Sequence, residues 1–97
     1  MAQKRTIEGI ILGSCIREIR EQLKEKDSQW TQEFVAKQIG MDEKHYGKLE
    51  RGYYPKPQFQ TIAKLMDILD ASIDEFWRNY KEELKRQNIS YDCPKEK

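Results

Sequence analysis

The chain has 97 residues, of which 36% are charged and 37% hydrophobic, and its formal net charge is +1. This length supports one hydrophobic core and excludes a second domain, and the composition is typical of a small helical protein rather than of a disordered chain. No apolar run approaches the roughly 18 residues that a membrane helix needs, and no signal-peptide cleavage site follows the short segment Ile7 to Gly13. We therefore expect a cytoplasmic, all-α protein.

The chain has few residues of the types that usually carry catalytic or metal-binding chemistry. Cys15 and Cys93 lie far apart in the sequence without metal-ligand spacing, so we expect inert thiols. His45 is the only histidine and has no ligand partners nearby. No nucleophile stands beside a base, and no glycine loop suits a phosphate. The sequence predicts a protein that is not an enzyme, with no metal, no cofactor and no small-molecule ligand.

A first helix is indicated by four apolar residues at the spacing of one helix face: Leu12, Ile16, Ile19 and Leu23. We expect this helix to begin between Thr6 and Leu12 and to end at about Lys26. A polar connection follows, and Trp30 then precedes Thr31, where an apolar residue can pack against the helix that it introduces.

Two short helices are predicted next, over about Gln32 to Ile39 and Glu43 to Arg51. Thr31 is suited to cap the first of them and Asp42 the second. Gly40 falls where the first helix must stop, in a turn that often needs a positive φ. The pattern predicts two helices joined by a tight turn.

The second of these helices is unusually polar, with only Tyr46 and Leu49 facing inward. Its remaining residues lie outside: Glu43, Lys44, His45, Gly47, Lys48 and Arg51. Such a helix is built to contact something polar. The spacing matches the helix-turn-helix motif, in which the second helix enters the major groove of DNA.

The net charge of +1 is low for a nucleic-acid-binding domain, but the charges are unevenly distributed. Between Lys44 and Lys56 the sequence has four cationic side chains against the single acid Glu50. Acids gather further along the chain: Asp67, Asp70, Asp74, Glu75, Glu82 and Glu83. A basic face opposite an acidic one fits DNA binding, although an ordinary salt-bridged surface is the alternative.

Two further helices follow the loop 52–57, and Pro57 can start the first of them. Its expected buried stripe is Phe59, Ile62, Leu65, Met66 and Leu69. Ser72 can cap the fifth helix. One side of the fifth helix carries Ile73, Phe76, Trp77, Tyr80 and Leu84. The end of the chain has no periodicity, and we expect it to be frayed.

This order of helices resembles the Cro/phage-repressor (Xre) family over about Leu12 to Trp77. The segments that carry the resemblance are LGSCIREIR, TQEFVAKQIGM, LERG and PQFQTIAKLMDILDASIDEF. The resemblance implies a five-helix, lambda-repressor-like domain over 12–77. It leaves an N-terminal extension over 1–11, and a helix extension with a frayed tail over 78–97. The connection before Trp30 is longer than is usual in the family.

The resemblance also implies roles for individual residues. The implied DNA-binding residues are Gln32, Glu43, Lys44, His45, Lys48, Arg51, Tyr53, Tyr54 and Lys56. Lysines facing base edges can donate to guanine, and a glutamate can accept from cytosine. Gln32 is expected to contact a phosphate or to brace the recognition helix, and the loop residues are expected to meet phosphates. Arg20 and Glu50 match a pair that is often a buried salt bridge in the family.

Each of these roles has a plainer alternative. Gln32 can be a solvated first-turn residue, Lys44 and Lys48 an ordinary exposed face, and Tyr53 and Tyr54 the packing of their loop.

These observations lead to two alternative hypotheses for the function. The first is a sequence-specific transcriptional regulator, expected to repress, that binds double-stranded DNA as a homodimer through Trp77, Tyr80 and Leu84. In the alternative packing, Trp77 and Tyr80 fold back on the first helix. The second function is a protein-interaction or antitoxin-like module on the same fold.

Overall fold

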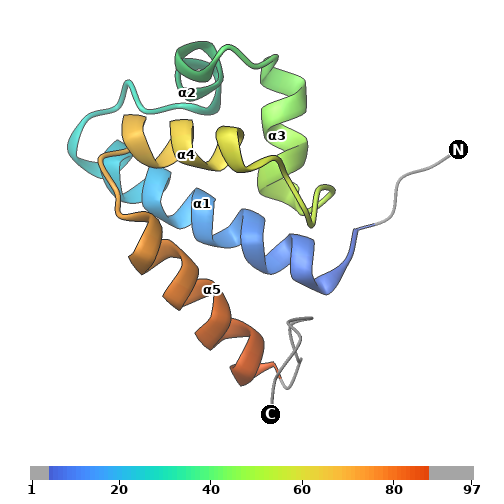
Figure 1. Cartoon of the computed structure of the whole chain (residues 1–97). Helices are drawn as coiled ribbons and strands as arrows, with labels where there is room; N and C mark the ends of the chain where they lie inside the picture. The colour runs from blue at the N-terminus through green and yellow to red at the C-terminus, as the bar shows by residue number, and fades with distance from the viewer. Residues whose placement is uncertain (1–4, 88–97) are drawn as a thin grey trace, which may run out of the picture.

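The computed structural model describes residues 5–87, over which the backbone forms five α-helices and no strand. The helices are α1 (Ile7–Lys26), α2 (Gln32–Ile39), α3 (Glu43–Arg51), α4 (Phe59–Ile68) and α5 (Ile73–Arg86). Figure 1 shows α1 crossing the middle of the molecule, with α5 on one side and the other helices on the opposite side. The expected all-α fold is confirmed. The frayed tail that the sequence predicts lies almost entirely outside the described residues.

The helix ends are set by the capping residues that the sequence indicates. The Thr31 hydroxyl accepts a hydrogen bond from the Phe34 amide at 3.1 Å, and the Asp42 carboxylate accepts one from the Lys44 amide at 3.0 Å. Gly40 ends α2 with φ at 73°, in the left-handed region that glycine enters at low cost. These three positions fix where α2 stops and where α3 starts.

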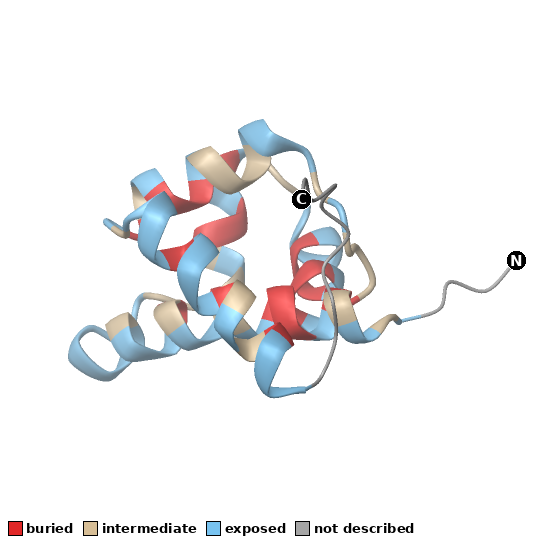
Figure 2. Ribbon diagram, turned by 60° about the horizontal axis from the view of Figure 1, so that its bottom comes forward, coloured by how far each residue is buried: buried red, intermediate tan, exposed pale blue. Residues whose placement is uncertain are grey.

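One hydrophobic core joins all five helices. α1 packs against α3 and α5, and α2 packs against α3 and α4. Figure 2 shows the buried residues on the inward sides of the helices. The buried apolar residues are Ile11, Leu12, Ile16, Val35, Ala36, Ile39, Tyr46, Leu49, Leu65, Met66, Leu69, Phe76, Tyr80 and Leu84.

The start of α4 differs from the sequence expectation. The sequence predicts that Pro57 starts the fourth helix and that Phe59 is buried. Instead, α4 begins at Phe59, and the preceding Gln58 is extended, with ψ at 145°. Phe59 is therefore in the first turn, ahead of the buried Leu65 and Met66, and its side chain is 72% exposed. Its expected burial is wrong because the first turn of α4 projects beyond the core.

The apolar side of α5 is wider than its buried face. Phe76, Tyr80 and Leu84 recur every four residues and are buried, whereas Ile73 is 39% and Trp77 44% exposed. A helix with an apolar stripe this wide can bury only its centre against a single neighbour. Ile73 and Trp77, which the sequence places on the same side of the helix as the core residues, therefore lie at the surface.

The backbones of α1 and α3 come into direct contact at two glycines of α1. A Cβ atom added at Gly13 would lie 2.4 Å from the Leu49 carbonyl oxygen, and one added at Gly9 would lie 2.4 Å from the Gly52 carbonyl oxygen. Real Cβ atoms do not come this close to backbone. The last turn of α3 is thus held against α1 at a separation that only glycine permits.

A buried ion pair joins the same two helices. Arg20 Nε donates to Glu50 Oε2 at 2.7 Å, and Arg20 Nη2 donates to Glu50 Oε1 at 3.0 Å. The two side chains are 4% and 1% exposed. The guanidinium also donates to the Trp30 carbonyl oxygen at 3.1 Å, so the pair that the family resemblance implies also holds the entry to α2.

The surroundings of Glu50 favour its charged form. Burial alone would raise the pKa of this carboxyl, but hydrogen bonds from Arg20 and Gln32 outweigh it and lower the pKa. The Tyr46 hydroxyl is buried beside them without meeting normal hydrogen-bond geometry. Its pKa is raised, first by burial and then by the Glu50 charge. The site therefore holds a paired carboxylate and a neutral phenol.

Gly13→Ala should destabilise the protein, because the added methyl group would meet backbone oxygens that cannot rotate away. We expect a loss of about 1–3 kcal/mol in the free energy of unfolding, although alanine ordinarily stabilises a helix relative to glycine. Ser14→Ala, at the next and exposed position, is the control and should change stability by no more than about 0.5 kcal/mol. Urea unfolding measures both, and a stabilising Gly13→Ala would contradict the close helix contact.

Glu50→Gln should lower the free energy of unfolding by about 3–5 kcal/mol, because the Arg20 charge is left buried without its partner. The matched control is Glu21→Gln. It removes the exposed carboxylate that lies 3.3 Å from Arg20 Nη2 and should cost no more than about 1 kcal/mol. Equal melting temperatures for Glu50→Gln and wild type would show that the pair contributes nothing.

The Glu50→Gln variant also tests how the stability of the protein depends on pH. Because the folded-state pKa of Glu50 is lowered, its stabilisation is complete above the unfolded value of about 4.3 and is lost as the pH falls through the folded value. Wild type should therefore lose more stability on acidification than Glu50→Gln does. Equal losses of stability in wild type and Glu50→Gln on acidification would contradict this role of Glu50.

Candidate nucleic-acid interface

The helix-turn-helix unit lies at one edge of the molecule, where α2 and α3 are joined by a short turn (Figure 1). Ala36 is 1% exposed, and its carbonyl oxygen accepts a hydrogen bond from the Met41 amide at 2.8 Å. At the entry to α2, the Trp30 and Phe34 rings meet edge to face at 5.1 Å. The unit is therefore fixed at both ends of α2.

α3 has one buried side and one polar side. Tyr46 and Leu49 face the core, with exposures of 0% and 1%. The exposed residues of α3 are Glu43, Lys44, His45, Lys48 and Arg51. The expected exposure of Gly47 is wrong: Gly47 is buried, because it lies beneath the Arg51 guanidinium, where a Cβ atom would be 3.0 Å from Arg51 Nη1. The structure thus places the five expected side chains of α3 on the surface.

Gln32 binds the buried ion pair. Its Nε2 donates to Glu50 Oε1 at 2.9 Å, so it joins the start of α2 to the end of α3. Its side chain is half-buried, and its Oε1 lies 3.4 Å from a Cβ position at Gly47. Of the two roles that the resemblance implies, the structure shows a contact that suits bracing. The phosphate contact stays a prediction.

The loop after α3 is packed against that helix. The His45 and Tyr54 rings are stacked, with centroids 5.1 Å apart and planes 27° from parallel. Tyr53 and Tyr54 are half-buried, and Lys56 is exposed. The packing alternative therefore describes Tyr54 well, because its ring contacts both His45 and the edge of the core.

Arg5 is a further cation at this loop. Its Cζ atom lies 5.9 Å from the centroid of the Tyr53 ring, within the range of a cation–π contact. Arg5 lies in the expected N-terminal extension over 1–11, for which the sequence indicates no role. Cations ahead of the first helix follow no periodic pattern, so the position of Arg5 beside the loop emerges only from the folded chain.

The electrostatics of this surface follow from the burial of Glu50. That residue is the sole acid between Lys44 and Lys56 in the sequence, and it is buried and paired with Arg20. The exposed side chains of this interval therefore carry positive charge alone. Asp42 and Glu43, at the start of α3, are the exposed acids beside them.

The three expected interface residues of α5 are not gathered at the surface. Tyr80 and Leu84 are buried within their own chain, whereas Trp77 is exposed. The Trp77 and Tyr80 rings are stacked with centroids 5.4 Å apart, and Tyr80 belongs to the core that α5 shares with α1.

Residues 5–87 contain no group of three or more histidine, cysteine or acidic side chains that could hold a metal ion, and no helix among them could span a membrane. Cys15 is a free thiol. Burial, with Glu18 and Glu83 nearby, raises its pKa to about 11, which disfavours the reactive thiolate. Cys93 lies outside the described residues.

Comparison with known proteins gives one result. The model of a helix-turn-helix family matches residues 16–76, from the middle of α1 into α5. No curated protein matches the chain, and no solved structure matches it. The matched segment contains α2, the turn, α3 and the buried pair that holds them. The chain therefore belongs to the Cro/C1-type (Xre-like) helix-turn-helix family of DNA-binding domains.

Proposed function

We propose that the chain is a cytoplasmic, sequence-specific transcriptional repressor without catalytic activity, which binds double-stranded DNA as a homodimer. The observation that carries the proposal is α3, a helix with a polar outer face that the buried Arg20–Glu50 pair holds in place. α3 would enter the major groove, whose base edges differ for each base pair. Occupation of a promoter would then exclude the polymerase.

Base reading is assigned to Glu43, Lys44 and Lys48. The lysines would donate to guanine N7 and O6, and the glutamate would accept from cytosine N4. His45 and Arg51 would lie along the edges of the groove. Contacts to phosphates would come from Gln32, Tyr53, Tyr54 and Lys56. Such contacts set affinity and register but carry no sequence information.

A dimer is expected because one domain of this size covers few base pairs, whereas dimers of this motif read two half-sites about 34 Å apart. The surface offers a mostly apolar groove of about 760 Å³, lined by the start of α1, the loop before α4, the start of α4 and α5. Phe59, Ile73 and Trp77 line it and are exposed. Contiguous apolar side chains of this size mark interaction surfaces, so we place the dimer contact here, around Trp77.

Selection of bound sequences from a random duplex pool tests the function directly. We expect an enriched, two-fold symmetric sequence, since operator symmetry mirrors that of a dimeric protein. Recovery of no preferred sequence at low salt would overturn the proposal and favour the protein-interaction alternative.

Lys44→Ala and Lys48→Ala should each relax base preference at one position of the half-site, with a loss of about 1–3 kcal/mol of discrimination. Lys56→Ala should weaken binding to all sequences alike and reduce the salt slope by about 1. Fluorescence anisotropy on the selected operator and on its single-base variants measures both effects.

The control for these variants is Lys85→Ala, in the last turn of α5. It removes the same charge without touching α3 or its loop and should leave discrimination unchanged. If all four variants lose affinity equally on every sequence, α3 does not read bases.

Phe59→Gln combined with Trp77→Gln should shift the protein from dimer to monomer, because both side chains are exposed in the single chain and neither belongs to its core. Leu84→Ala is the contrasting variant. It should lower the free energy of unfolding by about 2–5 kcal/mol and leave self-association unchanged, since Leu84 is fully buried. Sedimentation equilibrium and urea unfolding separate the two effects, and a wild type that is monomeric both free and on its operator excludes the dimer.

A further inference from the structure

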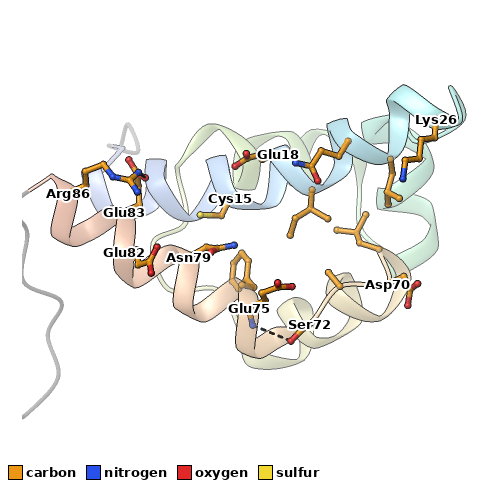
Figure 3. A pocket seen from close by; sticks show the side chains of 16 residues that line it. Cys15, Glu18, Lys26, Asp70, Ser72, Glu75, Asn79, Glu82, Glu83 and Arg86 are labelled. Atoms are coloured by element: carbon orange, nitrogen blue, oxygen red, sulfur yellow. Dashed lines mark hydrogen bonds and ion pairs between the residues drawn. The ribbon is translucent and has the colours of Figure 1, made fainter.

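A second groove lies between α1 and α5, and no role in DNA binding uses it. Figure 3 shows side chains of both helices lining it, together with the α4–α5 connection. Its volume is about 570 Å³. Neither α3 nor the loop after α3 contributes a lining residue. A ligand in this groove would therefore leave the DNA-reading side chains uncovered.

The walls of the groove are acidic. Among residues 5–87, five carboxylates line it, against two cations. The acids are Glu18, Asp70, Glu75, Glu82 and Glu83. Arg86, one of the cations, is already paired with Glu83, so Lys26 at the far end of α1 is left to offset the others.

Acids from both helices act on the centre of the groove. Cys15 lies there on α1 (Figure 3). After burial, the two causes that raise the pKa of its thiol to about 11 are the charges of Glu18 on α1 and Glu83 on α5. The negative potential thus extends across the groove, and like charges on its two walls repel each other.

The floor of the groove is apolar. Ile19 and Leu23 of α1 are half-buried there, and Phe76 of α5 is buried. The two helices leave this strip partly uncovered between their acidic edges. An apolar floor with acidic walls complements a segment that has an apolar face and cationic flanks. Nucleic acid is excluded by its own negative charge.

We propose that this groove binds a cationic amphipathic helix of a partner protein, with apolar side chains on Ile19, Leu23 and Phe76 and with lysines or arginines beside the carboxylates. The proposal does not rest on the dimer, whose groove has different walls apart from Phe76. The partner would be recruited to DNA that α3 already occupies. The groove thus gives the domain a second function, as an adaptor.

The test uses the full chain and a labelled leucine–lysine peptide of about four helical turns, followed by fluorescence anisotropy. A leucine–glutamate peptide of the same pattern is the charge control. We expect the first peptide to bind and the second not to bind, and we expect binding to weaken as salt rises. Equal binding of both peptides would overturn the proposal, because the walls would then play no part.

Variants locate the site. Glu18→Gln with Glu82→Gln should weaken peptide binding about tenfold at low salt. Glu25→Gln, an exposed acid of α1 that does not line the groove, should change it less than about twofold. Equal effects of the two variants would place the peptide elsewhere. Melting curves confirm that both are folded, as expected for exposed side chains.

Changes in amide chemical shifts during an NMR titration locate the bound peptide independently. Shifts along α1 from Cys15 to Lys26 and along α5 would support the groove, whereas shifts confined to α3 or to the Trp77 groove would refute it. Saturation with the selected operator should leave peptide affinity unchanged. If DNA displaces the peptide, the two compete for α3. That result would also refute the groove proposal, and it would leave the proposed function in DNA binding unaffected.

Discussion

The position of α3 depends on one buried contact with α1, made of two glycines and an ion pair. Gly9 and Gly13 let the end of α3 approach the α1 backbone, and Arg20 and Glu50 close the same interface two turns further along α1. Each constraint needs the other, because water would enter a wider interface and screen the charges. Gln32 then joins α2 to the pair, so the motif is fixed from inside.

An apolar pair of similar volume could give comparable stability, but it would not fix orientation to the same degree. Arg20 and Glu50 meet through two hydrogen bonds from one side of the guanidinium, a geometry that tolerates little rotation. α3 is only nine residues long and anchors two apolar side chains. A directional contact near its end limits rotation about its axis, and in the proposed binding mode that rotation would decide which side chains face a DNA groove.

Much of this arrangement could be predicted from the sequence. Apolar spacing placed the helices, and Thr31, Gly40 and Asp42 marked their ends, because capping and positive φ depend on local residues. The exposure of Phe59 could not be predicted, since periodicity gives the apolar face of a helix but not how far that helix extends beyond the core. The role of Gly13 was also missed, because a close helix contact involves residues distant in the sequence.

The separation of charge explains how a chain of net charge +1 can bind DNA. The molecule measures 45 × 34 × 22 Å, whereas charges in physiological salt are screened over about 8 Å. In the proposed binding mode, DNA approaching α3 would therefore respond to Lys44, Lys48 and Arg51, and little to the acids between α1 and α5. At lower salt the screening length grows, and the acidic side would then orient the domain by repulsion so that, in the proposed mode, α3 meets the DNA first. Local charge, rather than the total, governs which face binds.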